Sequence, residues 1–130
     1  MTQPRLTVDL DRAFLERVYV GDDLEGFARF VGLAVTNPHF LVYAAHPNTL
    51  GVLEIRESGY DLGRICYGHH LAGDWRLVRH ALAVAKARGC RHLLYPIRSG
   101  RPNTGQLFEV LTRRYQFEPY QLLLAKNLEL

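Results

Sequence analysis

The segment DLGRICYGHHLAGDWRLVRHALAVAKARGCRHLLY, Asp61 to Tyr95, decides the fold because its hydrophobic period changes twice. An apolar run from Tyr60 to Gly68 is typical of a strand. From about Asp74 to Arg88 the period is helical, and Gly89 is a stop signal at the helix end. The run from Arg91 to Ile97 predicts the next strand. We therefore expect a strand, a short loop, a helix and a second strand that lies parallel to the first.

The rest of the chain predicts helices and strands on both sides of this segment. Apolar residues recur at helical spacing up to Asn37-Pro38, and the period then changes to that of an antiparallel meander with tight turns. The expected elements are a strand at 6–10, a helix capped by Asp11, a helix from Asp22 or Asp23 to Asn37, strands at 40–46 and 50–57, a helix that Asn103 and Gln106 open as a capping box, and a strand at 119–128.

The element order β-α-α-β-β-β-α-β-α-β predicts an α/β (α+β) fold with a mixed central sheet of about six strands. A chain of 130 residues, 48% hydrophobic and 22% charged, fits one domain over residues 1–130 with its own core. No apolar leader or membrane-spanning stretch is present in the sequence, so we expect a cytoplasmic protein without membrane contact. Cys66 and Cys90 have no CxxC spacing and are expected to be reduced packing residues.

The net charge of +3 comes with 14 arginines, and arginine favours bidentate contacts with phosphate or carboxylate. An anionic ligand is therefore admissible. Basic residues with interleaved aromatics do not form a run, which gives little support to nucleic-acid binding. If the protein is a regulator that binds nucleic acid, the expected contacts are Arg76, Arg79, Arg113 and Arg114.

Three stretches resemble the acetyl-CoA-dependent N-acetyltransferase (GNAT) superfamily, and the element order agrees over practically the whole chain. DLGRICYG is similar to the family's fourth strand, HALAVAKARGCRHLLY to its third helix and fifth strand, and RRYQFEPYQLLLAK to the segment entering its last strand. In that family the fourth strand splays from the fifth, and the pantetheine arm of acetyl-CoA lies in the opening. The resemblance implies a GNAT-like fold and acetyl transfer from acetyl-CoA to an amine.

The loop GHHLAGDW stands where the family binds pyrophosphate with the pattern R/Q-x-x-G-x-G/A. In frame, Ala72, Trp75 and Leu77 occupy the three pattern positions, and a shift by two residues recovers only Gly73. Asp74 is expected to cap the following helix and to compete with phosphate for its N–H groups. The pyrophosphate loop is therefore degenerate.

Acetyl transfer needs a base, an amide donor for the thioester carbonyl and an acid for the leaving thiolate. The resemblance implies Asp61 or Glu54 as the base, and it places Thr112 at the acid position, counting back from Phe117. The family's glycine before that phenylalanine is Gln116 here. The resemblance also implies a backbone amide near Tyr67 as the carbonyl donor. The residues expected at acetyl-CoA are Cys66, Tyr67, Gly68, Gly73, Arg76, Arg79 and Asn103.

The adjacent histidines His69 and His70 are a candidate metal site. Neighbouring residues on an extended segment point to opposite faces, so the two rings are not expected to share an ion. Cys66 and His69 have C-x-x-H spacing, but a closed structural zinc site needs two further ligands. The sequence predicts no metal.

Two functions remain open. The first is an acetyl-CoA-dependent N-acetyltransferase whose acceptor is a small-molecule or protein amine. The second is a non-catalytic protein without a cofactor, which binds a protein partner as an assembly component. The stretch GDWRLVRHAL and the Asn-containing turn before the last helix are similar to small GNAT-like proteins of tailed bacteriophages. That resemblance implies a location in the host cytoplasm or the virion.

Overall fold

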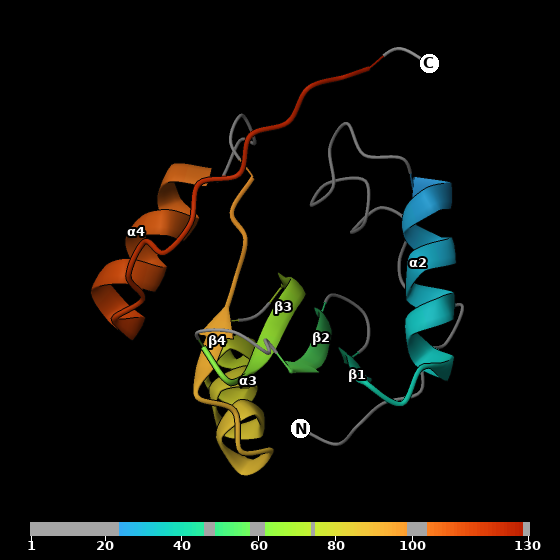
Figure 1. The fold of residues 1–130 in the computed structure, drawn as a ribbon, viewed down its shortest axis with the longest axis horizontal. Helices are drawn as coiled ribbons and strands as arrows, with labels where there is room; N and C mark the ends of the chain where they lie inside the picture. The colour runs from blue at the N-terminus through green and yellow to red at the C-terminus, as the bar shows by residue number, and fades with distance from the viewer. Residues whose placement is uncertain (1–23, 46–48, 58–61, 74, 99–103, 129–130) are drawn as a thin grey trace. The chain divides into compact units, whose positions relative to one another are not determined.

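The computed structural model describes residues 24–45, 49–57, 62–73, 75–98 and 104–128. Figure 1 shows the helices and strands. They are α2 (Leu24–Thr36), β1 (Phe40–Ala45), β2 (Thr49–Glu57), β3 (Arg64–Ala72), α3 (Arg76–Ala87), β4 (His92–Leu94) and α4 (Thr104–Tyr115). The strand expected at 6–10 and the helix expected after Asp11 lie outside the described residues. No helix in the described ranges is long and apolar enough to cross a bilayer.

The sheet has the strand order β1-β2-β3-β4. β1 pairs antiparallel with β2, β2 pairs antiparallel with β3, and β3 pairs parallel with β4. The meander and the parallel crossover through α3 that the sequence predicts are therefore confirmed. β3 continues through both histidines to Ala72, so most of the expected loop GHHLAGDW is strand.

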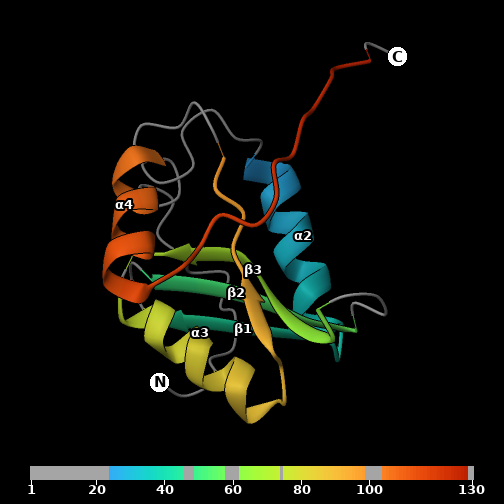
Figure 2. The same cartoon turned by 60° about the vertical axis from the view of Figure 1, so that its left-hand side comes forward.

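The helices α2 and α3 cover opposite faces of the sheet, as Figures 1 and 2 show. Successive residues of a strand point to opposite faces, so each strand supplies side chains to both layers. Under α2, the buried residues are Val31, Ala34, Val42, Leu50 and Val52. Under α3, they are Leu41, Leu53, Cys66, Ala81 and Ala85.

The helix ends follow local sequence signals. The Asn37 side chain accepts a hydrogen bond of 2.9 Å from the His39 backbone N–H, which fixes the turn into β1. Gly89 follows α3 with φ of +75°, and the backbone N–H of Cys90 donates to the Ala85 carbonyl. Such a left-handed residue is a common helix terminator, and glycine adopts it without strain. Both predicted helix ends are confirmed.

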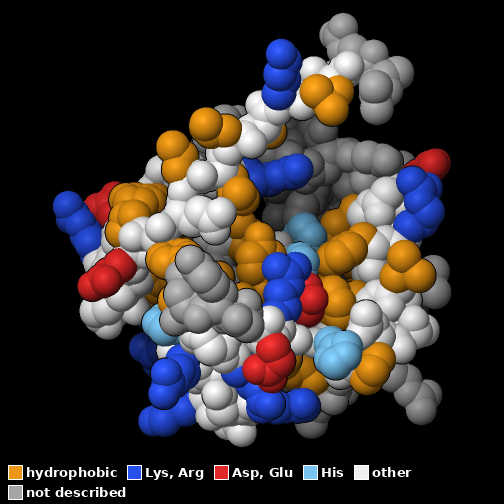
Figure 3. Space-filling model, in the orientation of Figure 1, with side chains coloured by type: hydrophobic (Ala, Val, Ile, Leu, Met, Phe, Trp, Pro, Cys, Tyr) orange, Lys and Arg blue, Asp and Glu red, His pale blue; other side chains and the backbone are white. Residues whose placement is uncertain are grey.

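The chain divides into two compact units, Met1–Pro96 and Ile97–Leu130. In the second unit α4 is followed by a segment without a strand, so the strand expected at 119–128 is not formed and the described sheet has four strands rather than about six. Its leucines are exposed, with Leu122 at 83% and Leu124 at 86%, and Figure 3 shows hydrophobic side chains along it. An apolar run becomes a strand only beside a hydrogen-bonded neighbour, and this segment has none within the described residues.

Candidate functional site

The sheet opens between β3 and β4. The parallel ladder joins Ile65 to His92, Cys66 to Leu93 and Tyr67 to Leu94, and it ends there. β3 continues along β2 to Ala72, whereas β4 ends at Leu94. The strand predicted from Arg91 to Ile97 is therefore only three residues long. Beyond Tyr67, this edge of β3 therefore has no neighbouring strand within the described residues.

A β-bulge lies at the same place on β3. Val52 is paired with His70 and Leu53 with Gly68, so His69 is an extra residue opposite this step of β2. A bulge shifts the alternation of side chains by one residue. Both imidazoles therefore lie beside Phe30. Its ring centroid is 5.1 Å from that of His69 and 5.9 Å from that of His70.

Both histidines thus lie on the α2 face, and the expectation that they point to opposite faces is wrong. The reason is the bulge, which strand pairing creates and local sequence does not reveal. Within the described ranges, no group of three or more His, Cys, Asp or Glu side chains is placed to hold a metal ion.

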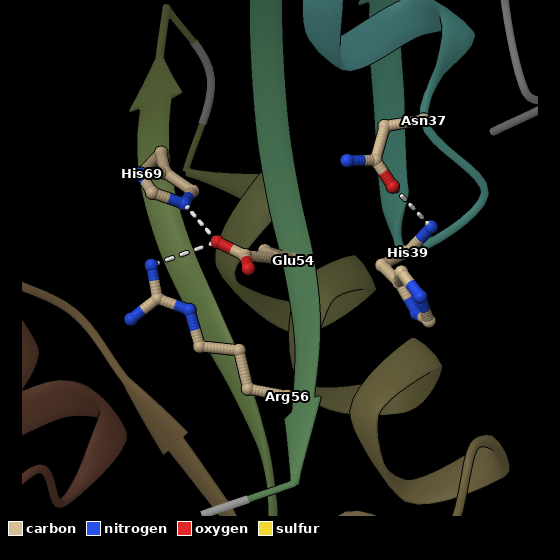
Figure 4. Close-up of polar contacts among 5 residues, drawn as sticks. All are labelled: Asn37, His39, Glu54, Arg56 and His69. Carbon is tan, nitrogen blue, oxygen red and sulfur yellow. Dashed lines mark hydrogen bonds and ion pairs between the residues drawn. The ribbon is translucent and has the colours of Figure 1, made fainter.

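Glu54 joins the two strands at this bulge. Its Oε1 lies 2.7 Å from Nε2 of His69 and 2.8 Å from Nη2 of Arg56, as Figure 4 shows. The Glu54 and His69 side chains are each 18% exposed, so solvent or a ligand can reach both. Figure 3 shows acidic, basic and histidine side chains meeting on one face of the molecule.

The charges of the cluster keep Glu54 ionised. Burial raises the pKa of this carboxyl, but hydrogen bonds and charge from Arg56 and His69 together bring it below its ordinary value. The hydrogen bond to Glu54 raises the pKa of Arg56. Because an ionised carboxylate only accepts hydrogen bonds, Nε2 of His69 must donate to it. In the neutral imidazole, Nδ1 of His69 then carries the lone pair.

Aromatic rings hold the His69 side chain in place. Phe40 is stacked on it with ring centroids 5.4 Å apart, and Tyr67 contacts it edge-on at 4.7 Å. The Arg56 guanidinium in turn lies 4.3 Å above the Tyr67 ring. An imidazole that a carboxylate orients and aromatic rings confine is the arrangement of a general base in nucleophilic reactions.

The sequence-predicted catalytic residues fall in different places. Glu54 lies in the cluster just described, and Asp61 lies outside the described residues. Thr112 is in α4, where its hydroxyl donates to the backbone carbonyls of Phe108, at 2.8 Å, and Glu109, at 3.2 Å. The Thr112 proton is therefore engaged within its own helix.

The residues expected to bind acetyl-CoA also lie in different places. Asn103 lies outside the described ranges. Cys66 is fully buried beneath α3, and burial raises the pKa of its thiol to about 12, so its side chain belongs to the core. The Tyr67 ring faces Arg56 and His69, and its backbone is paired with Glu54 of β2 and Leu94 of β4. Gly68 is buried at the opening, and Gly73 has φ of +100° before α3.

At the start of α3, Trp75 occupies the N-cap position, and its side chain makes no capping hydrogen bond. Asp74 itself lies outside the described residues. Trp75 is 36% exposed. Arg76 and Arg79 are exposed in the first turn of α3, beyond the loop that follows the opening.

Sequence reasoning missed three residues of this site. Arg56 is two residues beyond Glu54 on one strand, so the alternation of side chains could have placed both on one face. Tyr95 lies two residues beyond Leu93, so alternation could also have placed these two side chains on one face. Tyr95 contacts Gly68 across the opening. The sequence singles out His69 only as a possible metal ligand, because its position beside Glu54 depends on the bulge.

Comparison with known proteins finds no matching family model and no significantly similar curated sequence. Solved structures do match. An aminoglycoside antibiotic 6'-N-acetyltransferase from Acinetobacter haemolyticus superposes with a TM-score of 0.62 at 11% identity, over 91% of this chain and 92% of the other.

Two further matches were solved with ligands. AAC(6')-Iy in complex with the bisubstrate analogue CoA-S-monomethyl-acetylneamine has a TM-score of 0.62 at 11% identity, over 89% and 87% of the two chains. A predicted acetyltransferase from Clostridium acetobutylicum with acetyl-CoA has a TM-score of 0.58 at 13% identity, over 89% and 86%. At such identities the likeness concerns the fold alone. The chain has a divergent form of the fold of GNAT-family acetyltransferases.

Proposed function

We propose that this protein transfers an acetyl group from acetyl-CoA to an amine. The observation that carries the proposal is the position of the Glu54–His69 pair, which lies at the bulge of β3 beside the point where β4 leaves that strand. A base and an open strand edge thus occur together. The edge supplies backbone groups for a thioester, and the base serves the amine that attacks it.

The residues present suit acetyl-CoA as a substrate in two respects. Gly68 is bare backbone at the opening, where an extended pantetheine arm needs to approach a strand closely. The first turn of α3 carries Arg76 and Arg79, and a helix N-terminus with arginines favours phosphate groups. The indole of Trp75 stands where the family's pattern has glycine, so phosphate binding here relies on arginine more than on loop backbone.

His69 is the base in this proposal. Its Nδ1 accepts the proton of the acceptor ammonium, and Glu54 stabilises the imidazolium through Nε2. The free amine attacks the thioester carbonyl, which forms the C–N bond. The C–S bond then breaks, the thiolate of coenzyme A takes the proton back from the imidazolium, and the nitrogen of the new amide loses its extra proton to water. The products are the acetylated amine, the free thiol and one proton.

Backbone donors of β3 beyond Tyr67 stabilise the oxygen that becomes negative during the attack. Fixed N–H groups are effective in this role because they need no reorganisation when charge develops. Arg56 keeps Glu54 ionised and positions it, so it acts through the base and does not contact the substrate.

The proposal is tested by acetyl transfer from acetyl-CoA to a panel of amines, detected as release of the thiol. Aminoglycosides are the first acceptors to try, because two of the similar structures are aminoglycoside acetyltransferases. Glu54→Gln and His69→Gln are expected to lower kcat about a hundredfold, as is typical for loss of a general base.

Glu57→Gln is the matched control. Glu57 lies on the same strand and also pairs with an arginine, Arg64, at 2.6 Å, but at the far end from the bulge. Its variant should keep the wild-type rate. Absence of transfer to every acceptor, in folded protein that also fails to bind acetyl-CoA, would reject the proposal.

The second candidate is a non-catalytic component that binds a protein partner. The observation that favours it is Trp75 at the N-cap position of α3, in place of the glycine of a phosphate-binding loop. It predicts a reproducible partner in a pull-down from the native source and no measurable binding of coenzyme A. Binding of coenzyme A at the opening of the sheet would decide against it.

A further inference from the structure

Tyr95 is the first residue beyond the last pair of the β3–β4 ladder. The Leu93 side chain, two residues earlier, packs on the cluster beneath α3, and residues two apart on an extended chain face the same side. The Tyr95 side chain accordingly turns back toward β3. It reaches across the opening from the strand that leaves the sheet.

The Tyr95 ring lies directly on the backbone of Gly68. A Cβ at position 68 would be 3.0 Å from Cδ2 of Tyr95 and 3.8 Å from Cδ1 of Leu71. The first distance is tighter than most real Cβ contacts, so a residue other than glycine would require the tyrosine ring to shift by a few tenths of an ångström. Glycine at this position therefore permits the close approach of the tyrosine.

The Tyr95 hydroxyl is engaged at the same strand. Burial raises the pKa of the Tyr95 phenol, and a hydrogen bond from the Leu71 backbone N–H offsets part of this rise. The phenol is therefore neutral at ordinary pH. Its oxygen occupies one of the backbone donors on β3 beyond the ladder.

Gly68 and Leu71 belong to the edge that faces the opening. The backbone N–H of Arg91 donates to the carbonyl of Arg64 at 2.8 Å, so the backbone of Arg64 points toward β4. Alternation along the strand gives Gly68 the same direction. Tyr95 thus covers the next two backbone positions that a ligand entering between the strands would meet.

We infer that Tyr95 closes this opening in the free protein, and that acyl-CoA binds only after the tyrosine side chain has moved off Gly68 and Leu71. The inference rests on the proposed function, because it names the group with which the thioester competes. It makes Tyr95 a determinant of affinity for coenzyme A. The tyrosine is not assigned a part in the chemical step.

The experiment is calorimetric titration of coenzyme A into the wild-type protein, Tyr95→Phe and Tyr95→Ala. Tyr95→Phe retains the ring and frees the Leu71 N–H, so the Kd should fall about fivefold, the usual net effect of one hydrogen bond. Tyr95→Ala also uncovers Gly68 and should bind at least as tightly. Tyr120→Phe removes a hydroxyl from an exposed tyrosine and should leave the Kd unchanged.

A second readout does not depend on coenzyme A. In the ligand-free protein, hydrogen exchange of the Leu71 amide should be faster in Tyr95→Phe than in wild type, because the hydroxyl no longer protects it. Equal exchange in the two proteins would overturn the inference. Equal or weaker coenzyme A binding by both variants, with binding by wild type, would overturn it while the proposed function stands.

The remaining outcomes are also decisive. Binding by Tyr95→Ala but not by wild type would support both the inference and the proposed function. Failure of wild type and both variants to bind millimolar coenzyme A, although they are folded, would reject the proposed function and the inference with it.

Discussion

Glu54 and His69 are fifteen residues apart in the chain, yet the carboxylate Oε1 lies 2.7 Å from the imidazole Nε2 across the β2–β3 pair. Their contact depends on the extra residue in β3, which turns His69 onto the face where Glu54 already lies. It also couples the candidate base to the part of the sheet where β3 loses its neighbour. A change in strand register would separate the base from the opening.

The first prediction concerns stability in acid. The folded-state pKa of Glu54 is below its ordinary value of 4.5, so its stabilising contribution is complete above that value and is lost as pH falls through the folded-state pKa. Below about pH 5, the free energy of unfolding should fall more steeply for wild type than for Glu54→Gln. Denaturant titrations between neutral and acid pH measure the two slopes.

Identical acid sensitivity of Glu54→Gln and wild type would show that the Arg56 and His69 contacts do not hold the carboxylate in solution.

The second prediction concerns the contact between Gly68 and Tyr95. Gly68→Ala places a methyl group 3.0 Å from the tyrosine ring and should lower the free energy of unfolding by about 2 kcal/mol, as overpacking does. In a Tyr95→Ala background the same substitution should have a much smaller effect. A double-mutant cycle by urea denaturation measures the coupling. Additive effects would contradict the contact.

The third prediction concerns the ends of α3 and α4. Gln116 follows α4 with φ of +57°, a conformation that is unfavourable for a residue with a Cβ. Gln116→Gly should raise the free energy of unfolding by about 1 kcal/mol, reduced by the loss of weak side-chain bonds to the Arg113 and Arg114 carbonyls.

Gly89 gives the reverse test, because it follows α3 with φ of +75° and has space for a methyl group. Gly89→Ala should destabilise the protein by about 1 kcal/mol. Thermal denaturation measures both changes, and opposite signs for the two substitutions are the expected result. A destabilising Gln116→Gly would mean that the side-chain bonds outweigh the backbone strain.

The fourth prediction concerns the two thiols. Burial raises the pKa of Cys66 to about 12 and also raises the pKa of Cys90. Since the thiolate is the reactive form, Cys66 in a Cys90→Ser variant should be alkylated slowly by iodoacetamide at neutral pH and rapidly in urea. Mass spectrometry follows the reaction. Fast alkylation of Cys66 in the native state would place this residue outside the core.

Local patterns predict the parts of the fold that depend on local physics. The helical period from Asp74 to Arg88 anticipates α3, and Gly89 and Asn37 mark helix ends because a left-handed residue and a side-chain turn act within a few residues. The segment 119–128 shows the limit. Its apolar run satisfies the pattern of a strand, but a strand also needs a neighbour with which to bond.

The candidate site is less accessible from sequence because it depends on pairing between strands. Glu54 could be chosen as a base by residue type, but its partner His69 could not, since the bulge depends on how β3 aligns with β2. Tyr95 was part of an expected strand, and its contact with Gly68 arises only because the β3–β4 ladder stops at Leu94.

The most direct test of the central claim is a crystal structure of the protein grown with saturating acetyl-CoA. The account predicts that the thioester lies against β3 beyond Tyr67, with the Tyr95 ring displaced from Gly68 and the pyrophosphate near Arg76 and Arg79. An opening still filled by Tyr95, with no acetyl-CoA bound there, would contradict it.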